Sequence, residues 1–317
     1  MIRLEVGVPR EGEPFADFSL CLPAGRGRFT RYRFLYMQYP ADPSLDFSGG
    51  TNSPANCSFY RICEAHIGRL EGGRFLPDYR ILQSGEIGFA LRERGAGDFV
   101  GGFHGDEIAT ELSLLADGRE LALDAPSSGE YREVRFLEKS TVFRCNTPDL
   151  PLLEHRQLYT ARGSELSVSQ SLGFLAEPLL TEVAYMPMLT VERIDPALPD
   201  LRLTDTLTFY EREGGECVAV FDTAPFGVMP EEGLPPSPRG IPAAAVLATG
   251  RESGLSVAAG LRLPEGSPLA GQVRASVWIR YGNDLDSKVY FNIAGGMNPR
   301  AGDHLEAEVY YRILLVE

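Results

Sequence analysis

Residues 165–174, with the sequence ELSVSQSLGF, decide the fold class of this chain. Apolar and small polar residues alternate, so that one face carries three serines and the other carries Leu166, Val168, Leu172 and Phe174. A period of two is typical of a β-strand with one buried face, because successive side chains point to opposite sides of a sheet. Only Gln170 interrupts the apolar face.

The same alternation recurs along the chain. It is clear at residues 273–281 and 305–311, and similar stretches lie near residues 29–39, 131–145, 183–191, 203–210, 216–222, 243–249, 254–262 and 286–294. Many of the 34 glycines and 23 prolines fall between these stretches, as in hairpin loops. No long segment has helical periodicity. We therefore predict a single all-β domain over residues 1–317, a large antiparallel two-sheet β-sandwich with few short helices.

Composition excludes several classes of partner. A formal net charge of −14 argues against nucleic acid, which is bound by clustered Lys and Arg. No apolar run approaches membrane-spanning length and the N-terminus lacks a signal-peptide pattern, so we expect no membrane partner and a cytoplasmic location. Signatures for metal, phosphate and serine-nucleophile sites are absent, so no metal and no cofactor are expected. The five cysteines form no CxxC pair and predict no disulfide framework. The oligomeric state is not indicated.

The most informative candidate motif is DFVGGFHGDE, residues 98–107. Paired glycines permit a tight turn or close approach to a ligand, and imidazole and carboxylate side chains move protons near neutral pH. In an extended strand, His104 and Asp106 would share a face and Glu107 would point away. Two assignments stay open: Asp106 tunes His104, or Glu107 faces the site. The structural alternative is a hairpin turn with exposed polar residues.

Other candidates lie on predicted strands. His155 sits where polar residues crowd the start of a strand, with Arg156 beside it, and Tyr185 lies on a methionine-rich strand. Tyr36 and Arg33 lie on an early strand, where an aromatic ring and a guanidinium can contact a ligand. The alternatives are an exposed strand edge for His155, core packing for the tyrosines and a solvated strand face for the arginine.

The residues also suggest a family. The two-sheet pattern, with GFHG at residues 102–105, resembles the galactose mutarotase-like supersandwich, shared by aldose epimerases and by domains of polysaccharide lyases and several glycoside hydrolases. Residues 184–189, AYMPML, are similar to the central strand before the second half of such sandwiches. Residues 288–296, KVYFNIAGG, resemble the His-x-Tyr-Phe-Asn-Leu-x-Gly motif of aldose epimerases. This run departs from the motif because Lys288 replaces the histidine and because it lies late in the chain.

The resemblance implies a carbohydrate ligand in a cleft on a concave sheet, and it leaves the reaction open. In an isomerase like the aldose epimerases, one group would protonate the ring oxygen of the sugar while another deprotonates the anomeric hydroxyl. In a polysaccharide lyase, a base would remove the proton beside a uronate carboxyl group.

The predicted roles follow from these two reactions. The catalytic candidates are His104, Glu107, His155 and Tyr185, and the substrate-binding candidates are Asp106, Arg156, Tyr36 and Arg33. Either arginine would hold a carboxylate through paired hydrogen bonds. The alternative function is a non-catalytic glycan-binding or structural β-sandwich protein, which would bind without turnover.

Overall fold

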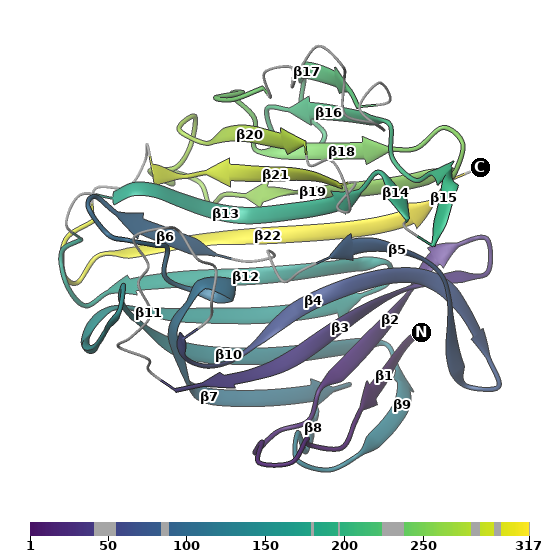
Figure 1. Cartoon of the computed structure of the whole chain (residues 1–317), viewed down its shortest axis with the longest axis horizontal. Coiled ribbons are helices and arrows are strands. Elements are labelled where there is room, and N and C mark those ends of the chain that lie inside the picture. Colours follow the sequence, from purple (N-terminus) through teal and green to yellow (C-terminus); the bar gives the residue numbers. More distant parts are fainter. Residues whose placement is uncertain are drawn as a thin grey trace.

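The structure, a computed structural model, describes residues 1–40, 55–83, 89–178, 181–195, 197–223, 238–279, 286–294 and 299–316. These residues are mostly in β-strands, and the short 3-10 helix η2 (Gly102–His104) leads into one of them (Figure 1). The predicted all-β class is confirmed.

The first layer is a run of antiparallel neighbours that starts at the bottom of Figure 1 and ends at its top. In spatial order its strands are β8 (Arg119–Leu121), β7 (Gly105–Ala116), β10 (Glu133–Arg144), β11 (Thr147–Arg162), β12 (Glu165–Phe174), β22 (His304–Leu315), β19 (Leu255–Arg262), β18 (Ala245–Thr249), β16 (Thr206–Tyr210) and β17 (Cys217–Asp222).

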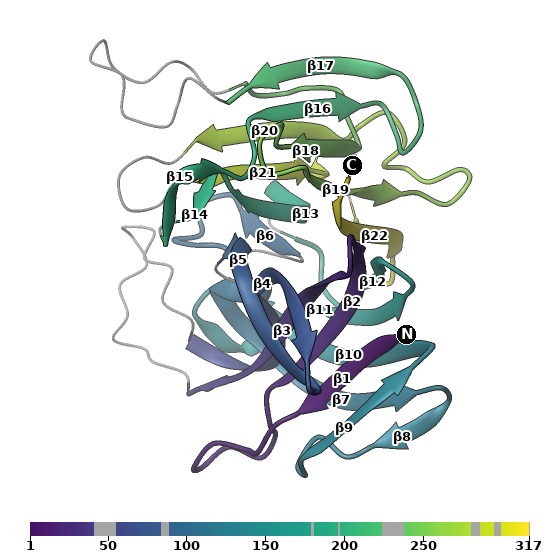
Figure 2. The same cartoon turned by 90° about the vertical axis from the view of Figure 1, so that its right-hand side faces the viewer.

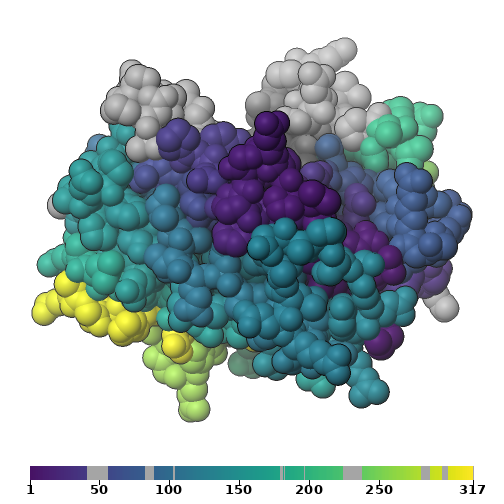
Figure 3. All heavy atoms as spheres, turned by 90° about the horizontal axis from the view of Figure 1, so that it is seen from below, coloured from purple at the N-terminus to yellow at the C-terminus, as the bar shows by residue number. Residues whose placement is uncertain are grey.

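The second layer lies in front of the first and is seen beside it in Figure 2. Its order is β9 (Ser127–Tyr131), β1 (Ile2–Val6), β2 (Phe18–Gly25), β3 (Arg28–Tyr39), β4 (Ala55–Glu71), β5 (Arg74–Gln83), β13 (Thr181–Glu192), β21 (Asp286–Asn292) and β20 (Arg274–Ile279), with β6 (Ala90–Glu93) also paired to β13. Figure 3 shows the N-terminal strands against residues more than 100 positions later, where β1 pairs with β9.

Two further connections complete the topology. The beginnings of β4 and β7 pair in parallel and join the two layers. The strands β14 (Ile194–Asp195) and β15 (Leu198–Arg202) form a separate two-stranded sheet.

The core lies between the layers. Phe34 of β3 packs edge-on against Phe136 of β10 and Tyr159 of β11, with ring centroids 6.0 and 5.2 Å apart. Phe18 of β2 stacks on Phe34 at 4.4 Å. The apolar face predicted from residues 165–174 is buried in this core, as its alternation requires. Gln170 is buried with it, at 2% exposure.

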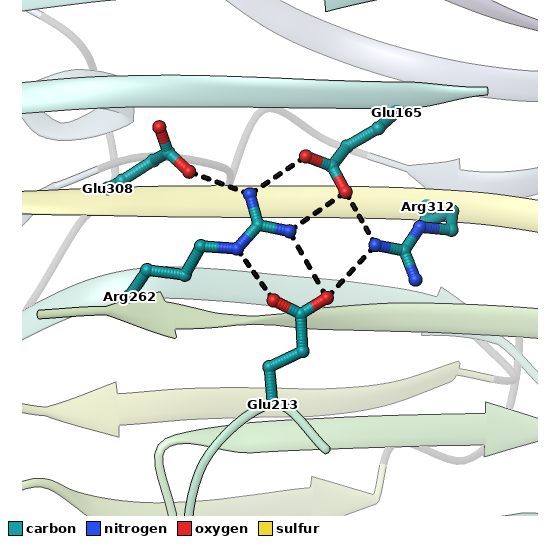
Figure 4. A network of polar contacts seen from close by, with 5 residues as sticks. All are labelled: Glu165, Glu213, Arg262, Glu308 and Arg312. Atoms are coloured by element: carbon teal, nitrogen blue, oxygen red, sulfur yellow. Dashed lines mark hydrogen bonds and ion pairs between the residues drawn. The ribbon is translucent and has the colours of Figure 1, made fainter. Parts of the chain in front are cut away.

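Charged side chains join three strands of the first layer outside this core (Figure 4). Arg262 of β19 contacts Glu165, Glu308 and Glu213 at 2.8, 2.6 and 2.6 Å. Arg312 of β22 contacts Glu165 and Glu213 at 2.6 and 3.0 Å. Hydrogen bonds from Arg262, together with those from Arg312, hold the pKa of Glu165 and of Glu213 below the usual value despite partial burial. The network fixes the turn after β16, which carries Glu213, to β12, β19 and β22.

All five cysteines are free thiols. In the described part of the chain, no helix has the length and apolar composition that a membrane span needs.

Candidate functional site

His104 lies at the end of a turn that requires glycine. The φ angles of Gly101, Gly102 and Gly105 are 86°, 55° and 82°, in the region that side chains disfavour. A Cβ atom on Gly102 would also lie 2.9 Å from the carbonyl oxygen of Phe89. The turn breaks the extended geometry on which the predicted pairing of His104 with Asp106 depended.

Glu107 and His155 meet inside the core. His155 Nδ1 lies 2.9 Å from Glu107 Oε1, and both side chains are buried. Ser140 donates a hydrogen bond to the same oxygen at 2.5 Å, and the backbone N–H of Gly102 donates to Glu107 Oε2 at 2.6 Å. Burial alone would raise the pKa of Glu107, but the charge of His155 and these hydrogen bonds outweigh it and lower that pKa. The buried carboxylate therefore anchors the turn that leads to His104.

Further polar groups continue from this pair. Gln170 Oε1 lies 3.1 Å from His155 Nε2, which explains the polar residue on the apolar face of β12. Glu138 accepts hydrogen bonds from the backbone of Tyr60 at 2.7 Å and from Gln157 at 3.3 Å. Burial, with a smaller effect of the Glu107 charge, raises the pKa of Glu138 well above its usual value. The two buried carboxyl groups therefore differ in direction, since the pKa of Glu107 is lowered and that of Glu138 is raised.

The carboxylate nearest to His104 is Asp98, which sequence reasoning did not select. His104 Nδ1 lies 3.5 Å from Asp98 Oδ1, and the two side chains are 10% and 6% exposed. Asp98 Oδ1 also accepts a hydrogen bond from the backbone N–H of Phe99 at 2.7 Å. His104 and Asp98 thus form an imidazole–carboxylate pair at ion-pair distance.

Four half-buried rings extend from this pair and are called the aromatic row: Phe99, Tyr185, Tyr290 and Trp278. The Phe99 ring lies 4.9 Å from the His104 ring and 5.7 Å from Tyr185, on which it stacks. Tyr290 lies 5.0 Å from both Tyr185 and Trp278. Burial raises the pKa of Tyr185, which keeps its hydroxyl protonated at neutral pH.

The aromatic row lies on the outer face of the second layer. The strand neighbours of its members, Ala184, Met186, Val277, Val289 and Phe291, belong to the buried core. Side chains alternate between the faces of a sheet, so Tyr185, Trp278 and Tyr290 point away from that core. The rings therefore form a surface of their own and are not needed to fill the sandwich.

The remaining predicted residues lie elsewhere. Asp106 is buried and accepts hydrogen bonds from Asn56 at 3.2 Å and from the backbone of Asn146 at 2.8 Å, so it joins two segments. Tyr36 is buried in the core and its hydroxyl lies 2.7 Å from Ser58 Oγ. These placements disagree with the predicted substrate-binding roles, because neither side chain is open to a ligand.

The two predicted arginines lie away from the aromatic row. Arg33 lines a groove of about 620 Å³ next to β1 and pairs with Asp17 and Glu64, both at 3.3 Å. Arg156 follows His155 on β11 and so points to the opposite face, where it lines a groove of about 550 Å³ with His304. The structure thus brings His155 to Glu107 and Tyr185 towards His104, and it leaves both arginines on other surfaces.

The sequence signal for the missed residues was weak. Asp98 and Phe99 open the motif around His104, and Tyr290 lies in the run that resembles the aldose epimerase motif. Trp278 is the single tryptophan of the chain. These residues lie on three separate segments, so no local pattern joins them. Among the described residues, no three His, Cys, Asp or Glu side chains gather in a metal-binding arrangement.

No model of a known protein family matches the chain, and no curated protein matches it. The chain is similar to the structure of a putative aldose 1-epimerase from Escherichia coli K12, at 12% identity and a TM-score of 0.38, over 95% of this chain and 100% of that one. It is similar to a GalM/aldose epimerase homologue from C. elegans, at 10% identity and a TM-score of 0.41, over 94% and 99% of the two chains.

A third similar structure is a GH36 α-galactosidase from Geobacillus stearothermophilus, at 10% identity and a TM-score of 0.42, over 99% of this chain and 40% of that one. Identities of 12% or less and TM-scores below 0.5 transfer no residue role to this chain.

Proposed function

We propose that this protein binds a carbohydrate on the aromatic row and that His104 transfers a proton to or from the bound sugar. The observation that supports this most is the row itself, which places four outward rings beside a histidine–carboxylate pair. Tyrosine and tryptophan combine an apolar ring face with a polar tip, which suits a sugar ring with its apolar face and hydroxyl groups.

A sugar ring at the exposed edge of Phe99 would lie near two groups that carry protons. His104 lies on one side of Phe99, at 4.9 Å between ring centroids, and Tyr185 lies on the other, at 5.7 Å. Isomerisation at an anomeric carbon needs one group that gives a proton and one that takes it. His104, which lies beside Asp98, takes the proton, and the hydroxyl of Tyr185 gives one. A lyase-like reaction would use His104 as the base in the same place.

Glu107 and His155 act as positioning residues in this proposal. Both side chains are buried, at 0% and 1% exposure, although His155 also contributes to the lining of the groove beside Arg156. Their contribution is the hydrogen bond from Gly102 to Glu107, which holds the turn just before His104. This replaces the direct catalytic roles predicted from the sequence for these two residues.

A non-catalytic glycan-binding protein is the second candidate. The burial of Glu107 and His155 favours it, because only His104 and Tyr185 of the four predicted catalytic side chains remain near the surface. In that case the aromatic row would bind a glycan and His104 would only contribute a contact.

The test combines binding and turnover. A panel of aldoses and polysaccharides is screened for anomer exchange by NMR and for unsaturated products by ultraviolet absorbance. We expect His104→Gln to abolish turnover and keep binding, and Tyr185→Ala to weaken binding. His304→Gln, on the outer face of the first layer, is the matched control and should change neither. Binding without turnover by the wild-type protein would favour the second candidate, and no binding at all would refute both.

A further inference from the structure

Three cationic side chains contact the aromatic row. The guanidinium of Arg92 lies 5.0 Å from the ring centroid of Phe99, and that of Arg239 lies 5.5 Å from Trp278. The ammonium nitrogen of Lys288 lies 5.9 Å from the centroid of Tyr290. A cation within about 6 Å of a ring face is attracted by the ring. Three of the four rings therefore carry a cation.

These cations come from separate parts of the chain and gather on one face. Arg92 belongs to β6, Lys288 belongs to β21, and Arg239 precedes the bridge between Ile241 and β20. Lys288 is two residues from Tyr290 on the same strand and lies directly across from Trp278 on β20. Both relations place Lys288 on the outward face of the second layer.

Two of the cations, Arg92 and Arg239, also influence the pKa of the same tyrosine, Tyr185. Burial is the largest influence on the pKa of Tyr185 and raises it, and the charges of Arg92 and Arg239 act against that rise. Both guanidinium groups are therefore near enough to Tyr185 to act on its hydroxyl. Beside the row, Asp98 is the carboxylate that pairs with His104.

These three side chains have the opposite charge to the molecule as a whole. The chain carries a formal net charge of −14, which repels anions at long range. A negative group on a ligand is attracted by the three nearby cations and repelled by the net negative charge of the molecule. A neutral sugar accepts hydrogen bonds from such side chains but gains no charge–charge attraction from them.

We propose that the aromatic row takes an anionic carbohydrate, one that bears a carboxylate or a sulfate group. Its rings would pack against the exposed parts of Phe99, Tyr185 and Trp278, and its anionic group would be held by Arg92, Arg239 and Lys288. Arginine suits both groups, because its planar fork donates two parallel hydrogen bonds to an oxyanion. This inference rests on the proposed function, since it specifies the sugar that the same row binds.

Lys288 gains a role in this proposal. In the aldose epimerase motif that residues 288–296 resemble, the first position is a histidine, and here it is a lysine. A lysine keeps its positive charge at neutral pH, whereas a histidine is largely neutral there. The departure from the motif therefore adds a permanent cation to the row.

The experiment compares matched oligosaccharides by isothermal titration calorimetry on the full-length protein. The probes are oligogalacturonate, its methyl ester, a neutral galactan oligomer and a sulfated galactan oligomer. We expect an acidic probe to bind at least about tenfold more tightly than its neutral counterpart, a difference equal to about 1.4 kcal/mol. This preference should shrink at high salt, because salt screens exposed charges. A comparison of oligogalacturonate with the sulfated galactan oligomer shows whether a carboxylate or a sulfate group is preferred.

Two variants test whether these cations hold the anionic group of the ligand. Lys288→Met and Arg239→Met remove a charge and keep an apolar side chain over the ring. Each variant should bind the acidic probe several-fold more weakly and bind the neutral probe with unchanged affinity. Arg251→Met is the control, because that side chain is 83% exposed and lies in a turn before β19. Circular dichroism and thermal unfolding confirm that each variant is folded.

The outcomes separate the two proposals. If neutral probes bind as tightly as acidic ones, or if both Met variants leave the acidic preference intact, the anionic ligand is refuted and the carbohydrate site stands. If no carbohydrate binds to the wild-type protein, the proposed function itself is refuted.

Discussion

The change Glu107→Gln tests the buried pair most directly. Three donors reach the Glu107 carboxylate: His155 Nδ1 at 2.9 Å, Ser140 Oγ at 2.5 Å and the backbone N–H of Gly102 at 2.6 Å. Glutamine keeps the shape but offers one oxygen, and its NH2 group must face at least one of these donors. Removing one partner of a buried ion pair costs about 3–5 kcal/mol. We expect the free energy of unfolding to fall by about 3 kcal/mol at neutral pH.

Urea unfolding measures this change, and Glu111→Gln is the matched control. Glu111 lies on the same strand but is 49% exposed and pairs with Lys139 at 2.6 Å. Exposed pairs of this kind contribute about 0.5 kcal/mol, so the control should lose little. A loss below about 1 kcal/mol in Glu107→Gln would show that the buried contacts do not stabilise the fold as argued.

The pH dependence gives a second readout for the same variant. The folded-state pKa of Glu107 is lowered from 4.5, so its contribution to stability is present above pH 4.5 and is lost as the pH falls through the lower value. The difference in unfolding free energy between wild type and Glu107→Gln should therefore narrow in acid. A difference that stays constant or grows with falling pH would contradict the ionised state of Glu107.

Three further changes are open to the same measurement. Burial raises the pKa of Glu192 to about 7 against the opposing charge of Arg80, so its stabilising contribution is complete below pH 4.5 and is lost as the pH rises through 7. Across this pH range, the free energy of unfolding of Glu192→Gln should therefore change less than that of the wild-type protein. An unchanged pH dependence would contradict this. In Gly68→Ala the new Cβ would lie 2.2 Å from the carbonyl oxygen of Leu76, so urea unfolding should show a loss of about 2–3 kcal/mol, and a neutral result would refute the clash. Arg262→Met removes the contacts to three carboxylates in Figure 4 and should cost about 1 kcal/mol, less at high salt; a loss that does not depend on salt would point to packing instead.

Much of the fold could be predicted because alternation is a local signal. The stretch 165–174 coincides with β12, and the stretches near 254–262 and 286–294 contain β19 and β21. The strand β4 was missed for a physical reason. Its pairing with β3 and β5 shifts register at three places, and each irregularity disturbs the alternation of faces.

The candidate site could be predicted only in part. The glycines around His104 were recognised because a tight turn needs them locally. The pairing partner could not be derived, because positive φ angles at Gly105 and Asp106 redirect the chain and bring His104 towards Asp98. The aromatic row was missed because its members are separated by 86, 93 and 12 residues in sequence, from Phe99 to Tyr185, Trp278 and Tyr290.

The polar residues of the core can be understood together. Gln170, His155 and Glu107 each occupy a buried position, and each alone would lose the hydrogen bonds that water provides. In the structure they form a chain, at 3.1 and 2.9 Å, that ends at the N–H of Gly102, although the buried Nε2 of Gln170 has no hydrogen-bond partner among the described residues. A buried network of this kind holds its members in one geometry when its groups are paired. The polar interruption in β12 thus belongs to the set of contacts that fix the turn before His104, and a sandwich made only for stability would place apolar side chains there.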